Sequence, residues 1–385
     1  MCEKFTDGDW IEAKDQSDSG VRLVQTGNVG VTEYLDKPNN KKWISFETFE
    51  QLHCEEVYPG DILISRLPEP AGRACIMPNL GTKMITAVDC TIVRPNAVTS
   101  TRFLLQYLSS QAYFDAVNTC LAGGTRQRIS RGNLAQFNVP IPSSKIEQEK
   151  IGEVLEKLDT LITLHQRKYE KLVNIKKSML DKMFPKNGAS VPEIRFKGFT
   201  DPWEQRKLSD IVEKVTEKNA GWQYIETFTN SAEFGIISQR DFFDHDISKI
   251  GSLDGYYVVH NEDFVYNPRI SVTAPVGPIN RNKLGRTGVM SPLYTVFRPH
   301  DIDTTYLEHF FKSEYWHSFM NFNGDSGARS DRFSIKDSVF FEMPIPTPDI
   351  EEQKKIGEFL TLLDTLITLH QREHIKPILE VKRVK

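Results

Sequence analysis

The sequence predicts an α+β protein in which two globular domains alternate with two long helices. Three observations predict this class. Residues 152–167 and 357–372 are identical at 13 of 16 positions, so one long segment occurs twice. Both copies carry apolar residues at the spacing of a coiled-coil helix. The stretches that precede them hold short apolar runs separated by turn residues, a pattern typical of strands.

The repeat extends upstream of the helix in weaker form. Pro140-Ile141-Pro142 matches Pro344-Ile345-Pro346, and Gly60-Asp61-Ile62-Leu63 corresponds to Glu262-Asp263-Phe264-Val265. A period of about 200 residues is far too long for a solenoid, so it indicates a duplicated module of one globular domain and one helix. We therefore expect a first domain at 1–143, a central helix and linker at 144–187, a second domain at 188–347 and a C-terminal helix at 348–385.

The globular parts show strand and helix patterns in the same order. Apolar runs at 61–65, 90–93, 256–259 and 293–297 predict strands. One helix is expected in each half, at 102–118 and 304–321, where apolar residues recur at helical spacing. Prolines and glycines between 184 and 203 predict a linker before the second domain.

The repeated segment predicts long helices. Ser144 with Glu147, and Asp349 with Glu352, have the spacing of a capping box, and prolines just upstream prevent an earlier start. The apolar stripe has the spacing of a coiled-coil seam, which needs a partner, and the nearest candidate is the other copy. Its members are Leu158, Ile162, His165, Tyr169 and Leu172 in one copy and Leu363, Ile367 and His370 in the other. Pro377 is expected to disturb the second helix.

Composition excludes several classes of protein. The longest apolar runs are too short to cross a membrane, and the polar, acidic start does not resemble a signal peptide, so we expect a cytoplasmic protein without membrane contact. The five cysteines form no Cys-x-x-Cys pair, which disfavours both a disulfide framework and a zinc site. A net charge of −4 gives no global argument for nucleic acid, so any such argument must rest on local clusters.

Motifs for catalysis are missing. The sequence has no phosphate-binding loop, no dinucleotide fingerprint and no Asn/Asp-Pro-Pro-aromatic motif, since Asn267-Pro268-Arg269-Ile270 fails it. Asp349, Glu352 and Lys354 imitate a nuclease pattern, but their spacing places them in the first turn of a helix, where carboxylates act as caps. Glu351-Glu352 and Lys354-Lys355 are interpreted as a solvated helix face, and the histidines form no metal-ligand set.

Two basic loops at corresponding places are candidates for binding DNA. Glycines next to arginines let the backbone approach a ligand while guanidinium groups reach phosphate or guanine. The candidates are Gly124, Arg126, Arg128 and Arg131 in the first half and Gly327, Arg329, Arg332 and Lys336 in the second. The alternative is a solvated basic turn, but recurrence in both halves favours DNA.

These features together resemble the specificity subunit of type I restriction-modification systems. The resemblance rests on the doubled helix motif Ile-Glu-Gln…Ile-Gly…Leu-Asp…Ile-Thr-Leu-His-Gln-Arg after Pro-Ile-Pro, and on the Gly-Asp-Ile-Leu and Gly-Thr-Arg elements. It covers essentially the whole chain.

The resemblance implies two target-recognition domains, each reading half of a bipartite site in double-stranded DNA. It implies that the long helices pack as an antiparallel coiled coil, which sets the spacer and carries two modification (methyltransferase) subunits and then restriction subunits. S-adenosylmethionine, ATP and Mg would belong to those partners, and this chain would be non-catalytic.

Two other functions fit the residues less well. A self-sufficient nuclease or methyltransferase would bind S-adenosylmethionine, or cut DNA with a divalent metal, without partners. A coiled-coil adaptor with protein-binding domains would not shift DNA in a mobility assay.

Overall fold

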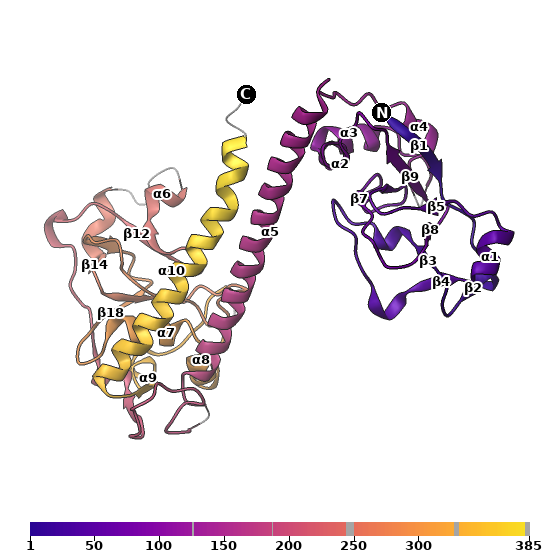
Figure 1. Ribbon diagram of the computed structural model, residues 1–385. Coiled ribbons are helices and arrows are strands. Elements are labelled where there is room, and N and C mark those ends of the chain that lie inside the picture. The colour runs from indigo at the N-terminus through magenta and orange to yellow at the C-terminus, as the bar shows by residue number, and fades with distance from the viewer. Residues whose placement is uncertain (125–126, 187, 244–249, 327–330, 382–385) are drawn as a thin grey trace. The chain divides into compact units, whose positions relative to one another are not determined.

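The computed structural model describes residues 1–124, 127–186, 188–243, 250–326 and 331–381, with side chains described outside 242–252 and 372–381. The chain forms two compact units, Met1–Leu164 (unit 1) and His165–Lys385 (unit 2). Both combine small sheets with helices, as the sequence predicts (Figure 1). Within the described ranges, no helix is long and apolar enough to cross a membrane.

Unit 1 is built on two sheets. A five-stranded sheet has the order β2 (Gln16–Ser17), β4 (Lys42–Ile44), β3 (Val21–Val24), β8 (Met84–Thr86), β5 (Glu56–Val57). A four-stranded sheet has the order β1 (Cys2–Asp7), β9 (Cys90–Pro95), β6 (Ile62–Ser65), β7 (Ala74–Ile76). Only β3 and β8 pair in parallel. The predicted strands at 61–65 and 90–93 therefore lie side by side as β6 and β9.

Helices cover the four-stranded sheet of unit 1. They are α2 (Thr101–Tyr107), α3 (Gln111–Thr119) and α4 (Arg131–Ala135), while α1 (Phe46–Gln51) follows β4. Leu104, Tyr113 and Leu134 pack with Ile62 and Val93 of the sheet in one buried cluster. The single helix predicted at 102–118 is wrong, because Ser110 caps a new helix by accepting a hydrogen bond from the Tyr113 amide.

Unit 2 repeats the four-stranded sheet. Its order is β11 (Val212–Lys214), β18 (Thr295–Pro299), β15 (Phe264–Tyr266), β16 (Ile279–Arg281), all antiparallel. Three strand pairs accompany it: β10 (Glu204–Lys207) with β19 (Pro344–Thr347), β12 (Phe228–Ser231) with β13 (Gly235–Ser238), and β14 (Tyr257–Val259) with β17 (Gly288–Met290). The shorter helices are α6 (Gln239–Phe243), α7 (Thr304–Phe311), α8 (Tyr315–Asn323) and α9 (Asp337–Phe340). The region predicted as one helix at 304–321 is again two helices.

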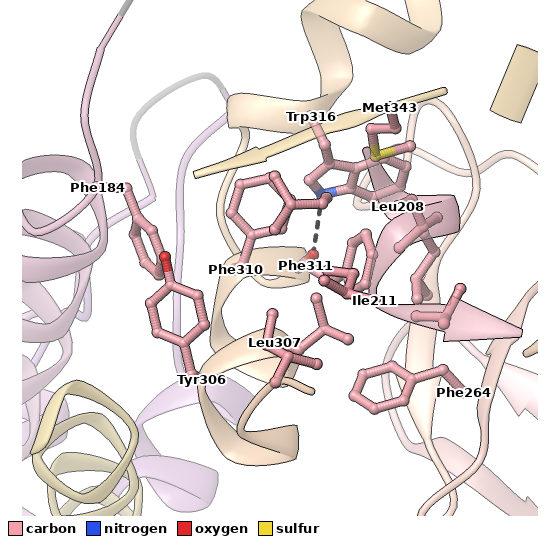
Figure 2. Packing of buried hydrophobic residues seen from close by; sticks show 14 of the residues in the cluster. Phe184, Leu208, Ile211, Phe264, Tyr306, Leu307, Phe310, Phe311, Trp316 and Met343 are labelled. Carbon is pink, nitrogen blue, oxygen red and sulfur yellow. Dashed lines mark hydrogen bonds between the residues drawn. The ribbon is translucent and has the colours of Figure 1, made fainter. Parts of the chain in front are cut away.

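An aromatic core joins the helices of unit 2 to its sheet. Figure 2 shows Tyr306 of α7 beside Phe184, and Phe311 of the same helix between Phe264 and Trp316. The Trp316 indole donates a hydrogen bond to the Phe311 carbonyl at 3.1 Å. Phe184, in the segment predicted as a linker, is buried in the same cluster. This segment is therefore packed into unit 2 at Phe184.

The two long helices are α5 (Lys145–Lys182) and α10 (Ile350–Val381). Within unit 2, the end of α5 runs antiparallel to α10, since His165 contacts His370 while Lys176 pairs with Asp364. The predicted antiparallel arrangement is confirmed. Pro377 does not end the second helix, which continues to Val381.

Candidate DNA interface

Both basic loops are anchored at the same point of their domains. In unit 1 the Ile129 amide donates to the Arg66 carbonyl at 3.2 Å, directly after β6. In unit 2 the Phe333 amide donates to the Pro268 carbonyl at 2.7 Å, two residues after β15. The repeat therefore places the two loops at equivalent ends of equivalent strands.

A buried aspartate braces each of these strands. Arg94 donates two hydrogen bonds to Asp61, at 2.8 and 2.7 Å, and Arg298 donates two to Asp263, at 2.8 and 3.0 Å. These hydrogen bonds raise the pKa of both guanidinium groups. Bidentate pairs of this kind fix geometry as well as charge, so these two arginines support the sheet.

The first basic loop carries arginines that already face carboxylates. Arg128 lies 3.5 Å from Asp89, and Arg131 lies 3.9 Å from Asp7. Gly124 is exposed, while Arg126 lies outside the described residues. Gly123, which precedes Gly124, has a φ of 117°, a conformation that favours glycine.

The described part of the second basic loop has one carboxylate paired with its arginine. Arg332 is exposed, and the Asp331 carboxylate lies 4.0 Å away. Lys336 is exposed at the N-terminal cap of α9. Gly327 and Arg329 lie outside the described residues.

Sequence reasoning missed Arg269. Arg269 and Arg332 face each other in an isolated antiparallel bridge, and the Ile270 amide donates to the Asp331 carbonyl at 3.1 Å. The bridge places an exposed arginine beside the predicted loop. The sequence offers one indication of its role: Arg269 follows Asp263, the counterpart of Asp61 in the repeat, by six residues.

The seam residues occupy the long helices as their spacing requires. Leu158 and Ile162 lie on the part of α5 that belongs to unit 1. In unit 2, Leu363 is buried, and the Nδ1 atoms of His165 and His370 lie 3.0 Å apart. Leu172 packs against the buried cluster that contains Leu363, while Tyr169 and Ile367 are half-buried.

The nuclease-like pattern does not form a metal site. The Asp349 carboxylate accepts from the Glu351 amide at 2.8 Å. Glu352 is fully buried and accepts two hydrogen bonds from Arg195, both 2.8 Å, and one from the Trp203 indole. The prediction of Glu352 as a capping or solvated residue is therefore wrong. Among the described residues, no group of three His, Cys, Asp or Glu side chains could hold a metal ion.

Comparison with known proteins identifies the family. The model of the type I restriction modification DNA specificity domain matches this chain twice, over residues 3–174 and 200–379. The chain belongs to this family. Each match contains one basic loop, one braced sheet and the start of one long helix, so the specificity domain coincides with the repeated module.

Individual members of the family are distant in sequence. The MjaVIII specificity subunit of Methanocaldococcus jannaschii is 26% identical over 61% of this chain and 58% of its own length. The chain therefore spans less than two thirds of that relative. A putative MjaX specificity subunit of the same organism is 25% identical over 82% of this chain and 74% of its own length. The S subunit of a type I system from M. genitalium matches in structure with a TM-score of 0.49 and 12% identity, over 97% of this chain and 90% of the other.

Proposed function

We propose that this chain is the DNA-recognition subunit of a type I restriction-modification complex. Each globular domain, 1–143 and 188–347, reads one half of a bipartite site in double-stranded DNA. The observation that carries the proposal is the duplicated specificity domain, with a basic loop anchored identically in both copies. Two similar modules with different loop chemistry suit a site with two different halves.

The long helices serve as spacer and assembly platform in this proposal. The regions 144–187 and 348–385 would set the distance between half-sites. Their seam, with Leu158, Ile162, His165, Tyr169 and Leu172 opposite Leu363, Ile367 and His370, would hold the helices together and support two modification subunits. Restriction subunits would join that assembly. Adenine methylation with S-adenosylmethionine, and cleavage with ATP and Mg, would take place on the partners.

Salt-dependent DNA binding tests the role of the basic loops. Each lost phosphate contact lowers the slope of log K against log salt by about 0.9. Arg128→Ala and Arg332→Ala, each in the complex with modification subunits, are expected to weaken binding of double-stranded DNA and reduce this slope. Arg286→Ala is the control, because that exposed arginine belongs to neither loop and already pairs with Glu226.

The same titration can reject the proposal. Unchanged affinity and slope for both loop variants would reduce these loops to ordinary solvated turns. Methyl transfer or DNA cleavage by the purified chain alone would instead identify an enzyme.

A further inference from the structure

A cleft lies beside the second basic loop. Its volume is about 370 Å³, and its walls come from residues 229–232, 267–271, 293–294 and Arg332. Three hydroxyl-bearing residues, Thr229, Ser231 and Tyr294, line it together with Leu293, whose side chain is exposed. The cleft therefore offers donors, acceptors and an apolar surface within a few residues.

Two arginines, Arg269 and Arg332, line this cleft. Residues that face each other in an antiparallel pair have Cβ atoms about 5 Å apart, and like charges there are destabilising. Arg269 and Arg332 occupy such a pair. In the part of the chain that the structure describes, the Arg269 guanidinium has no hydrogen bond or ion pair. The ion pair described for Arg332 is the one with its neighbour Asp331, at 4.0 Å.

Among the described arginines of unit 2 outside the bridge, exposed Arg167 of α5 also has no partner, whereas the others do. Arg195, Arg281, Arg286 and Arg298 each pair with a carboxylate at 2.8 Å or less. Arg206 donates to backbone carbonyls, and Arg240 also has a partner. Two facing arginines without a close ion pair among the described residues are the pattern expected where a ligand supplies the missing partner.

The backbone that carries Arg269 is held in place. The Asn267 side chain accepts from the Arg269 amide at 2.9 Å and donates to the Asn230 carbonyl at 2.8 Å. Buried Asn230 in turn donates to the Val265 carbonyl of β15 at 2.7 Å. These hydrogen bonds hold the Arg269 backbone in a fixed position just after β15. A fixed position favours recognition of one defined base over loose contact with the DNA backbone.

We infer that Arg269 is a specificity-determining residue that reads a guanine in the half-site of the second domain. This inference rests on the proposed function and assigns its chemistry. Arginine presents two parallel donors to O6 and N7 of guanine, the commonest specific contact in the major groove. Arg332, on the glycine-containing loop, lies beside it and contacts the adjacent phosphate.

The unit 1 position that corresponds to Arg269 is Leu67, because the Arg66 and Pro268 carbonyls accept equivalent amides. The guanine contact therefore belongs to the second half-site alone.

Selection from a randomised double-stranded DNA library tests this inference. The complete complex with modification subunits is used, with the wild-type chain, Arg269→Gln, Arg269→Lys and the control Arg286→Gln. One guanine position in the second half-site is expected to lose about tenfold or more of its preference in both Arg269 variants. The lysine variant keeps the charge but loses the bidentate donors, so it separates base reading from charge. The first half-site and the control are expected to be unchanged.

Three outcomes separate this inference from the proposed function. A wild-type complex that selects no sequence would defeat the proposed function itself. A wild-type complex that selects a bipartite site, with Arg269→Gln selecting the same bases at the same affinity, would overturn only the inference. Weaker binding to every sequence, with a smaller salt slope and unchanged base preferences, would also overturn it by making Arg269 a phosphate contact.

Discussion

The two junctions between sheet domain and long helix share one polar contact and differ around it. Gln148 of α5 accepts from the Ser100 amide at 2.8 Å and donates to the Pro142 carbonyl at 2.8 Å. Gln353 of α10, 205 positions later, accepts from the Asp303 amide at 2.9 Å and donates to the Pro348 carbonyl at 2.8 Å. The residues just before these glutamines have different surroundings: Glu147 is exposed, whereas Glu352 is fully buried.

The shared glutamine and the buried glutamate have different structural roles. The glutamine contact joins each long helix to the start of α2 or α7, so it fixes the helix to its own domain. Glu352 instead holds a segment that comes from outside the junction, through Arg195 and Trp203. The copy of the motif that begins α10 therefore has a buried ion pair, whereas the corresponding Glu147 at the start of α5 is exposed.

The largest expected effect comes from breaking that pair. Arg195→Ala leaves the Glu352 carboxylate buried with only the Trp203 indole as a described partner, and removing one member of a buried pair costs about 3 kcal/mol or more. We expect the urea midpoint of unit 2, followed by tryptophan fluorescence, to fall accordingly. The matched change in the other junction, Glu147→Ala, is expected to alter the free energy of unfolding by less than about 0.5 kcal/mol.

A double variant sharpens this expectation. Arg195→Leu with Glu352→Leu removes both charges, so it is expected to be less destabilised than Arg195→Ala alone. Equal losses of unfolding free energy for Arg195→Ala and Glu147→Ala would show that the buried pair of Arg195 and Glu352 does not stabilise unit 2 more than an exposed glutamate does.

The sequence predicted the repeated elements better than the contacts between distant segments. The long helices and their antiparallel pairing follow from periodicity and duplication, both of which are visible in consecutive residues. Glu352 was misjudged because its partner Arg195 lies 157 residues earlier, and no local pattern links them. Arg269 was missed for the same reason, since only the fold brings it opposite Arg332. The break after Tyr107 is followed by a helix that Ser110 caps, which helical spacing does not reveal, whereas α8 begins after Glu314 without a side-chain cap.

An intermediate effect is expected from the shared glutamine contact. Gln148→Ala and Gln353→Ala each leave a backbone amide at a helix start without its acceptor, which costs about 1–3 kcal/mol. Because the hydrogen bonds are nearly equal in length, the two losses are expected to be similar. Hydrogen exchange of peptides covering 100–108 and 303–312 measures them separately in unit 1 and unit 2.

Locality is the control for this pair of variants. Gln148→Ala is expected to speed exchange in α2 and leave α7 unchanged, and Gln353→Ala is expected to do the reverse. A loss in both helices from either variant would contradict the idea that each glutamine fixes only its own domain.

The two basic loops differ in the carboxylates that lie near their arginines. Arg128 faces Asp89 at 3.5 Å, and Arg66 lies 3.9 Å from the same carboxylate. The corresponding Arg332 has Asp331 at 4.0 Å. If both loops bind DNA as proposed, the described arginines of the unit 1 loop would contribute less to the electrostatic attraction, because carboxylates already face them.

The smallest expected effect tests this compensation. Asp89→Asn removes the charge while keeping the shape and the Asp89 carbonyl that accepts from the Arg66 amide. An exposed pair is worth about 0–1 kcal/mol, so freeing Arg128 is expected to strengthen DNA binding by about two- to threefold and to steepen the salt slope. Asp331→Asn is expected to strengthen DNA binding by a smaller factor. Adding Arg128→Ala to Asp89→Asn should remove the gain, because the effect acts through that arginine. A gain that persists in this double variant would mean that Asp89 repels DNA directly, and the loops would then differ in net charge alone rather than in the pairing of their arginines.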